Sequence, residues 1–323
     1  MNRYEANRLT ERMTTVCLGR FLVDLPAAAV YRHTPAYIDG FWISGIEETG
    51  AAFASRVAAR AAEIDAEPNA IGNKNMESAE PVEIGGLSGK IFIFGRRMTR
   101  GIEHGLPVEW WNLKIEGYLH GSGKSFNFRN DGYPIHRTGH LRELMKQLRI
   151  VEPGEIPSAP GFCFGPGMLL DPLTPEQTEG VRIFASLPGA PDLAITFNTR
   201  AGLKNPGRPG RLVRHAMMHA ERPLWRKAMV AQLRVGKRTL AGIEGDEVIE
   251  CGTEPTLVDV YAFDWEVVGT TDDVRRPTMH LEMSTGHSPS RKVVPASLSQ
   301  EALFQLWDKI AGSTRLRPTS AAN

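Results

Sequence analysis

The chain repeats itself in order, and this internal repeat restricts its fold more than any other feature of the sequence. Three pairs of segments resemble each other between the halves, and an amphipathic segment closes each half. The first residues of the paired segments are 146, 156 and 150 positions apart. The pairs are CLGRFLVD (17–24) with CFGPGMLLD (163–171), GGLSGKIFIF (85–94) with AGIEGDEVIE (241–250), and VEWWNLKIEGY (108–118) with VDVYAFDWEVV (258–268). Four ordered matches predict two tandem copies of one domain; the alternative is that strands and turns recur by chance.

A proline-rich stretch separates the two copies. VEPGEIPSAPGF (151–162) contains Pro153, Pro157 and Pro160. Proline fixes φ and removes a backbone donor, so this stretch extends neither a helix nor a central strand. We therefore expect an N-terminal domain at residues 1–152 and a C-terminal domain at residues 160–317. The tail RPTSAAN (317–323) is expected to fray.

Each copy has the pattern of an α+β domain. A strand surrounds each of the matched cysteines, more strands and a helix follow, three further strands come next, and a helix closes the copy. Strands joined by short turns form antiparallel sheet, and we expect the helices to cover one face of it. The predicted fold class is α+β, with two tandem, duplicated domains, each a mainly antiparallel sheet covered by helices.

Hydrophobic periodicity places these elements on the chain. The first helix is predicted at 50–67, and its counterpart at 211–230 contains Pro223, which should break it. The apolar stripe of the first helix is Phe53, Val57, Ala61 and Ile64; those of the closing helices are Leu141, Leu144, Met145 and Leu148, and Leu303, Leu306, Trp307 and Ile310. The predicted middle strands are 90–94, 110–119 and 124–128 in the first copy, and 246–251, 258–268 and 278–283 in the second.

The segment HGSGKS (120–125) ends like a phosphate-binding loop. That loop needs a glycine five residues before its Gly-Lys-Ser end and a helix after it. This chain has Tyr118 at that position, and the alternating Phe126 and Phe128 predict a strand afterwards. We therefore predict a hairpin turn and no nucleotide binding.

No catalytic or metal-binding pattern is complete. His215 and His219 stand four apart in a predicted helix, as zinc ligands do, but a metalloprotease carries Glu where this chain has Ala216. The strings GGLSGK and FWISGIE lack the G-x-S-x-G spacing of a hydrolase elbow. We predict no catalytic residues, no metal site and no cofactor, so the chain is not an enzyme. Of the adjacent Trp110 and Trp111, which face opposite sides of a strand, we expect one in the core and the other exposed for binding.

The three cysteines do not form a disulfide framework. Cys17, Cys163 and Cys251 lie in apolar surroundings, and we expect buried thiols. The alternative, in an oxidising compartment, is a bond between Cys163 and Cys251 that leaves Cys17 alone, and the sequence does not decide between the two. The net charge of +1 gives no electrostatic argument for nucleic acid or an anionic membrane, and no apolar run is long enough to span a bilayer.

The ordered segments resemble a known family. ERMTTVCLGRFLVDLP, IGGLSGK, GFCFGPGMLLDP, LAGIEGDE and LSQEALFQLWDKIAGSTRLRP resemble the two-domain immunity proteins of bacterial type VI secretion that neutralise phospholipase effectors. The resemblance covers nearly the whole chain. It implies a protein that binds a lipase toxin and blocks substrate access, in the family's studied case by gripping the enzyme's lid between two domains. It carries over no catalytic residues, and partner-binding residues stay unknown because such surfaces are specific to each partner.

The resemblance also implies a compartment and a partner. Family members usually act in the periplasm, whereas MNRYEANRLTERMTTVCLGR lacks the apolar core of a signal sequence, so the cytoplasm is the alternative. The expected partner is a cognate phospholipase of the α/β-hydrolase type, which both domains together should inhibit more strongly than either alone. The alternative function is a non-catalytic two-domain binding scaffold or small-ligand carrier.

Overall fold

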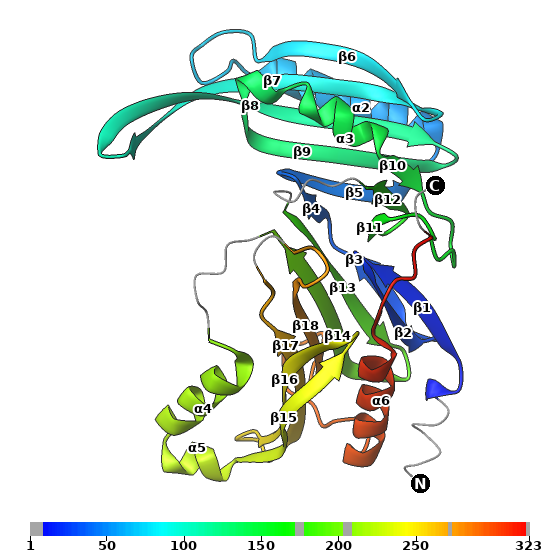
Figure 1. Ribbon diagram of the computed structural model, residues 1–323, viewed down its shortest axis with the longest axis vertical. Coiled ribbons are helices and arrows are strands. Elements are labelled where there is room, and N and C mark those ends of the chain that lie inside the picture. The colour runs from blue at the N-terminus through cyan, green and yellow to red at the C-terminus, as the bar shows by residue number, and fades with distance from the viewer. Residues whose placement is uncertain (1–8, 172–177, 203–208, 271–272, 321–323) are drawn as a thin grey trace. The chain divides into compact units, whose positions relative to one another are not determined.

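The structure is a computed structural model that describes residues 9–171, 178–202, 209–270 and 273–320 (Figure 1). The chain forms two compact units, each built from separate stretches of sequence. Unit 1 contains residues 1–34, 154–163 and 173–323, and unit 2 contains residues 35–153 and 164–172. The domain boundaries 1–152 and 160–317 remain a prediction about sequence repeats.

Unit 2 is built on an antiparallel sheet with the strand order β6-β7-β8-β9-β5-β4. A second small pairing joins β10 to β12. The strands are β4 (Ala36–Ile38), β5 (Phe41–Glu47), β6 (Met76–Ile84), β7 (Leu87–Glu103), β8 (Leu106–Gly121), β9 (Lys124–Pro134), β10 (Leu148–Ile150) and β12 (Gly167–Leu170); the helices are α2 (Gly50–Ala66), the short 3₁₀ helix η1 (Ile135–Arg137) and α3 (His140–Lys146).

Helices lie on both faces of the unit 2 sheet. Glu116 in β8 bonds to Arg60 of α2 at 2.7 Å, whereas a Cβ placed on the next residue, Gly117, would lie 2.5 Å from Met145 Cε of α3. Successive residues of a strand face opposite sides, so α2 and α3 cover opposite faces, as Figure 1 shows. The prediction that helices cover one face was therefore wrong.

Unit 1 carries an antiparallel sheet with the strand order β15-β16-β17-β18-β14-β13, and β3 pairs with β13. A three-stranded sheet, β1-β2-β19, completes it. The elements are β1 (Met13–Leu18), β2 (Phe21–Pro26), β3 (Val30–His33), β11 (Gly161–Phe164), β13 (Glu179–Leu187), β14 (Ala190–Ala201), α4 (Arg211–Glu221), α5 (Leu224–Ala228), β15 (Val230–Leu240), β16 (Ile243–Thr253), β17 (Asp259–Val267), β18 (Thr278–Ser284), α6 (Gln300–Ser313) and β19 (Arg315–Leu316); β11 reaches unit 2 at its last residue.

The unit 1 sheet is also covered on both faces. Glu247 of β16 accepts a hydrogen bond of 2.7 Å from the Trp307 indole of α6, whereas Glu250, three residues along, contacts His215 of α4 at 2.9 Å. An odd spacing along a strand places two side chains on opposite faces. The closing helix α6 therefore packs on one face and α4 on the other.

Two short strands join parts of the chain that are far apart in sequence. The hairpin β1–β2 pairs with β19 near the C-terminus, where Arg315 lies opposite Leu22. In unit 2, β12 pairs with β10, which directly follows α3. The hairpin β1–β2 of the first half therefore lies in the unit that contains α6, and β12 of the second half lies in the unit that contains α3.

The helices begin and end where their sequences indicate. Thr49 caps α2 through a hydrogen bond from Ala52 N–H, and Ser299 caps α6 in the same way. Such caps satisfy backbone donors that the first turn leaves free. Pro223 separates α4 from α5, as predicted. The predicted middle strands lie within β7, β8, β9, β16 and β18, and 258–268 exceeds β17 by one residue at each end. The mainly antiparallel sheet with helices is as predicted.

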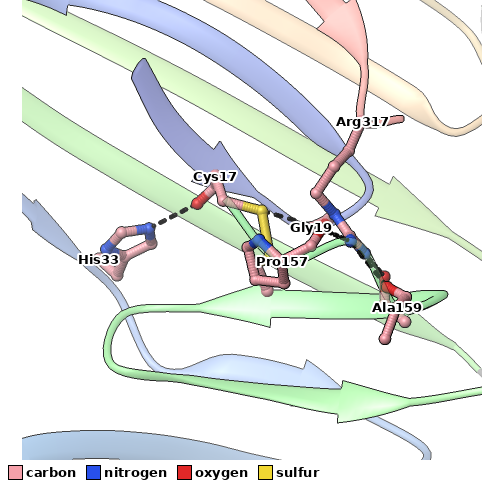
Figure 2. Close-up of a disulfide and its surroundings, with 8 residues drawn as sticks. Cys17, Gly19, His33, Pro157, Ala159 and Arg317 are labelled. Carbon is pink, nitrogen blue, oxygen red and sulfur yellow. Dashed lines mark hydrogen bonds between the residues drawn. A yellow bond between two sulfur atoms is a disulfide. The ribbon is translucent and has the colours of Figure 1, made fainter. Parts of the chain in front are cut away.

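The C-terminal segment corrects one prediction. Arg317 was expected to begin a frayed tail, but it is buried. Its guanidinium donates to the carbonyl oxygens of Pro157, Ala159 and Gly161, the last at 2.6 Å. Residues 151–160 form neither helix nor strand, as their prolines predict. A buried cation hydrogen-bonded to three carbonyls thus fixes residues 157–161 of the proline-rich stretch in unit 1 (Figure 2).

Candidate binding surfaces

The segment singled out as a false phosphate loop is a hairpin turn between β8 and β9. Its central residues, Ser122 and Gly123, have φ values of 50° and 72°, which two-residue hairpin turns of the primed type require. Lys124 pairs with Glu152 at 2.6 Å, and the Ser125 hydroxyl donates to Glu48 at 2.6 Å. Both groups that a nucleotide would need are therefore engaged in internal contacts.

The other residues weighed for chemistry also have structural partners. His215 is buried and contacts Glu250, and its ring centroid lies 6.2 Å from that of His219. Among the described residues no cluster of His, Cys, Asp and Glu is arranged to hold a metal ion. Cys251 is a free thiol, and burial raises its pKa. Within the described residues, no helix is both long and apolar enough to cross a bilayer.

Cys17 and Cys163 form a disulfide, so the expectation of buried thiols was wrong for these two cysteines, and the alternative bond of Cys163 to Cys251 is not formed. The sulfur atoms join β1 to β11 within unit 1, with the Cα atoms 5.9 Å apart (Figure 2). Two backbone hydrogen bonds between Gly19 and Cys163, of 3.0 and 2.9 Å, hold the strands together beside it. The half-buried His33 contacts the Cys17 carbonyl at 3.1 Å, and desolvation lowers the pKa of this imidazole.

A polar pocket of about 730 Å³ lies between α2 and the sheet of unit 2. Its charged groups are largely paired with one another: Arg60 bonds Glu116 through two hydrogen bonds of 2.7 and 2.9 Å, and Tyr118 donates to Glu116 at 2.6 Å. Arg56 donates to Glu48, which lowers the pKa of that carboxyl to about 2. The pocket is therefore lined by a neutralised ion network that fixes α2 on its sheet.

The helix α4 is held on its sheet by charges. Arg211 pairs with Asp264 at 3.1 Å, Arg214 pairs with Glu266, and Arg222 shares Glu250 with His215. The partners are carboxylates of β16 and β17. A surface helix normally turns its apolar residues to the sheet, so the orientation of α4 is reversed.

The reversal leaves apolar side chains on the surface. The α4–α5 outer face consists of Val213, Ala216, Met217, Ala220, Leu224 and Trp225, which are all exposed. Arg226 lies over the Trp225 ring, with Cζ 5.6 Å from the ring centroid. Contiguous exposed apolar groups commonly mark a surface that contacts another molecule.

A second exposed apolar surface lies at the joined ends of β7 and β8. We name residues 97–111 the hairpin arm. The register of β6 with β7 stops at Phe94, and that of β8 with β9 stops at Asn112. Among the described strands, the arm residues pair only with each other, apart from Arg97, which lies opposite Asn112. Figure 1 shows this ribbon projecting past the sheet.

The hairpin arm exposes large apolar side chains. Trp110 and Trp111 are 39% and 42% exposed, so the expectation that one lies in the core was wrong. Both indoles lie on the arm, beyond the last residues of β7 and β8 that pair with β6 and β9. Ile102 and Leu106, at its tip, are also exposed. A Cβ on Gly101 would lie 2.5 Å from Trp110 Cζ3, so this glycine lets the indole lie across the ribbon.

The chain matches two family models. Residues 14–131 match the Tle cognate immunity protein 4 N-terminal domain, and residues 155–319 match the Tle cognate immunity protein 4 C-terminal domain. A search of curated proteins gives no significant match.

Solved structures share the fold. The apo structure of immunity protein TplEi of T6SS from Pseudomonas aeruginosa is 24% identical, with a TM-score of 0.74, covering 95% of this chain and 98% of that one. The same protein complexed with "L" peptide, and the crystal structure of the Tle4-Tli4 complex, both match at 23% identity and a TM-score of 0.73. Each of these covers 95% of this chain, and 99% and 98%, respectively, of the other.

Proposed function

Because the chain belongs to the Tle cognate immunity protein 4 family, we propose that it binds a cognate phospholipase effector of type VI secretion and blocks access of substrate to that enzyme. It is an immunity protein, and it acts by binding and not by catalysis. The observation that carries the proposal is the match of both family domains, in order, over residues 14–131 and 155–319. A relative of the same fold is named for its Tle4-Tli4 complex. The partner we propose is an α/β-hydrolase.

The hairpin arm supplies contacts suited to a protein partner. An isolated two-stranded ribbon is marginally stable in water, yet this one carries two tryptophans and two aliphatic side chains at the surface. Tryptophan is enriched among the few residues that dominate binding energy. The corresponding strands of unit 1, β16 and β17, form no such extension, because β15 flanks β16 as far as Gly252. We therefore assign Trp110 and Trp111 to the effector interface.

The disulfide supports a periplasmic location. Disulfides persist in oxidising compartments and are rare in the cytoplasm. Cys17 and Cys163 are 146 residues apart in sequence, and Cys163 is buried, so the bond is a structural one between distant strands. We propose that the protein acts in the periplasm, with the cytoplasm as the alternative.

We also propose that the two sequence halves, 1–152 and 160–317, derive from a duplication. The strand orders β6-β7-β8-β9-β5-β4 and β15-β16-β17-β18-β14-β13 correspond strand by strand. When 108–118 is aligned with 258–268, Glu116 and Glu266 occupy the same position. Glu116 pairs with Arg60 of α2, and Glu266 pairs with Arg214 of α4. An equivalent ion pair at an equivalent strand position supports a common origin.

The carrier alternative finds less support. The unit 2 pocket is lined by Arg56, Arg60, Glu116, Arg129 and Asp131 among others, whereas carrier sites are mainly apolar with few polar groups. Arg56, Arg60 and Glu116 also bond to protein groups. A bound small molecule would therefore have to displace an ion network.

Titration of the effector encoded beside this chain tests the proposal. We expect stoichiometric inhibition of its hydrolysis of a soluble short-chain ester by the full chain. Trp110→Ala and Trp111→Ala should each weaken inhibition by about 30-fold or more, the loss typical of an interface hot spot. The matched control is Trp42→Ala, an exposed tryptophan in β5 of the same unit, which should inhibit like the unaltered chain.

The outcomes separate the parts of the proposal. Absence of binding by the full chain would contradict the immunity role for that effector. Full inhibition by both arm variants would leave the role standing and remove the arm from the interface. Point variants are preferred to the half-chains 1–152 and 160–323, because a cut at 152 removes β12 from β10 and separates β1–β2 from β19.

A further inference from the structure

The α4–α5 outer face has features that an internal packing role does not explain. Rolling α4 to bury Val213 and Met217 would break the pairs that Arg211, Arg214 and His215 form with the sheet. The helix is thus fixed with its apolar side outward. Burying large apolar side chains is favourable, so this arrangement forgoes stability that a conventional orientation would have supplied.

The charges that remain at the outer side of this face are mainly positive. Residues 209–229 contain Arg211, Arg214, Arg222, Arg226 and Lys227, against Glu221 as the one acidic residue of that stretch. The first three cations pair with sheet carboxylates. Arg226 and Lys227 lie on α5 beside Leu224 and Trp225. The cationic contribution of this face therefore comes from Arg226 and Lys227, against Glu221.

We propose that the α4–α5 outer face binds the surface of a bilayer that contains anionic phospholipid. Amphipathic helices that lie in a membrane interface combine an apolar face carrying Trp or Leu with flanking Lys and Arg. Tryptophan favours the headgroup level, and each cation near an anionic surface adds attraction. Leu224 is 84% exposed and Trp225 is 61% exposed, so both enter the interface without rearrangement. The inference does not depend on the proposed inhibitor role.

This binding is peripheral and reversible. Five to six side chains of two short helices enter the interfacial region, and the cations pair with lipid phosphate groups through charge-assisted contacts. Salt weakens the cationic contribution because it screens exposed charges. The consequence is an immunity protein held at the surface on which a phospholipase finds its substrate.

Co-sedimentation of the full chain with vesicles tests the proposal. The vesicles are phosphatidylcholine alone or phosphatidylcholine with phosphatidylglycerol. We expect binding to the anionic vesicles, weakened by salt. Met217→Glu combined with Leu224→Glu should reduce binding by about tenfold or more, since two apolar side chains leave the interface. Arg226→Gln and Lys227→Gln should each reduce it by about fivefold at low salt.

The matched control is Ile102→Glu on the hairpin arm. Ile102 is 77% exposed, so the substitution places a carboxylate at an equally open apolar site in the other unit. This variant should bind vesicles like the unaltered chain. Circular dichroism and the midpoint of urea unfolding check that every variant is folded.

Two results would overturn the proposal. One is absence of sedimentation with the anionic vesicles. The other is equal sedimentation of the Met217→Glu, Leu224→Glu variant and the unaltered chain. If that variant instead loses inhibition of the effector toward a soluble ester while vesicle binding is unchanged, the face is a protein contact. Inhibition measured on a soluble ester involves no membrane, so failure of the inhibitor role is read separately.

Discussion

Loss of the disulfide should destabilise the protein substantially. Cys17 and Cys163 are 146 positions apart, and closing a loop of that size reduces the entropy of the unfolded chain by an amount worth about 5 kcal/mol in the chain-entropy model. Measured losses for native disulfides are about 2–5 kcal/mol. The double substitution Cys17→Ser, Cys163→Ser should therefore lower the free energy of unfolding by that amount and the Tm by about 3–7 °C, given the unfolding entropy of a chain of 323 residues.

Calorimetry with and without a phosphine reductant measures this effect. Reductant should lower the Tm of the unaltered chain to that of the double variant and leave the double variant unchanged. Cys251→Ser is the control, because Cys251 is a free cysteine and its variant should keep the full response to reductant. The reasoning would be refuted if thiol titration proved the bond reduced and the Tm of the unaltered chain stayed the same.

Three further results are expected. In urea unfolding, Gly19→Ala should destabilise unit 1 more than Gly85→Ala destabilises unit 2. Both glycines have φ near +58°, but a Cβ on Gly19 would lie 2.8 Å from an aromatic carbon, whereas a Cβ on Gly85 would meet nothing within 4 Å. Equal losses of stability would contradict this reasoning. The pKa of Glu48 falls from 4.5 to about 2 in the folded protein, so this carboxylate contributes stability above pH 4.5 that is lost as the pH falls toward 2. Glu48→Gln should therefore flatten the acid limb of the curve of unfolding free energy against pH. An unchanged acid limb would count against this role of Glu48. Arg60→Ala should lower the free energy of unfolding by about 1–3 kcal/mol, because its partner Glu116 stays buried without it. Arg100→Ala breaks an exposed pair and should lower it by less than about 1 kcal/mol. Similar losses for the two variants would show that burial does not decide the difference.

Local patterns predicted the elements better than their partners. The alternation around Phe126 and Phe128, the stripe of α6 and the break at Pro223 all depend on neighbouring residues, and the structure confirms them. Strand β6 was missed because Pro81 and several exposed residues obscure its pattern. Such composition is common in edge strands, which are protected against further pairing, and β6 lies at the edge of its sheet.

Long-range contacts could not be read from the repeat. The matched cysteine segments predicted equivalent positions in two separate domains, whereas β1 and β11 lie together in unit 1 and are joined by the disulfide. Two segments of similar sequence can each pair with a strand of their own sequence half or with the corresponding strand of the other half, and the similarity does not decide which. The outward apolar face of α4 was hidden for a related reason. Its arginines turn inward because Asp264 and Glu266 lie on the distant β17.

The pairing of β2 with β19 also dictates when the molecule can be finished. A ribosome makes the N-terminal hairpin first, but its neighbour at Arg315 and Leu316 comes at the far end of the chain. Almost the whole polypeptide must therefore be made before this sheet closes, while every residue of unit 2 is available earlier. Contacts of such long sequence separation form slowly. The sheet of β1, β2 and β19 thus stays incomplete until the last segment of the chain arrives.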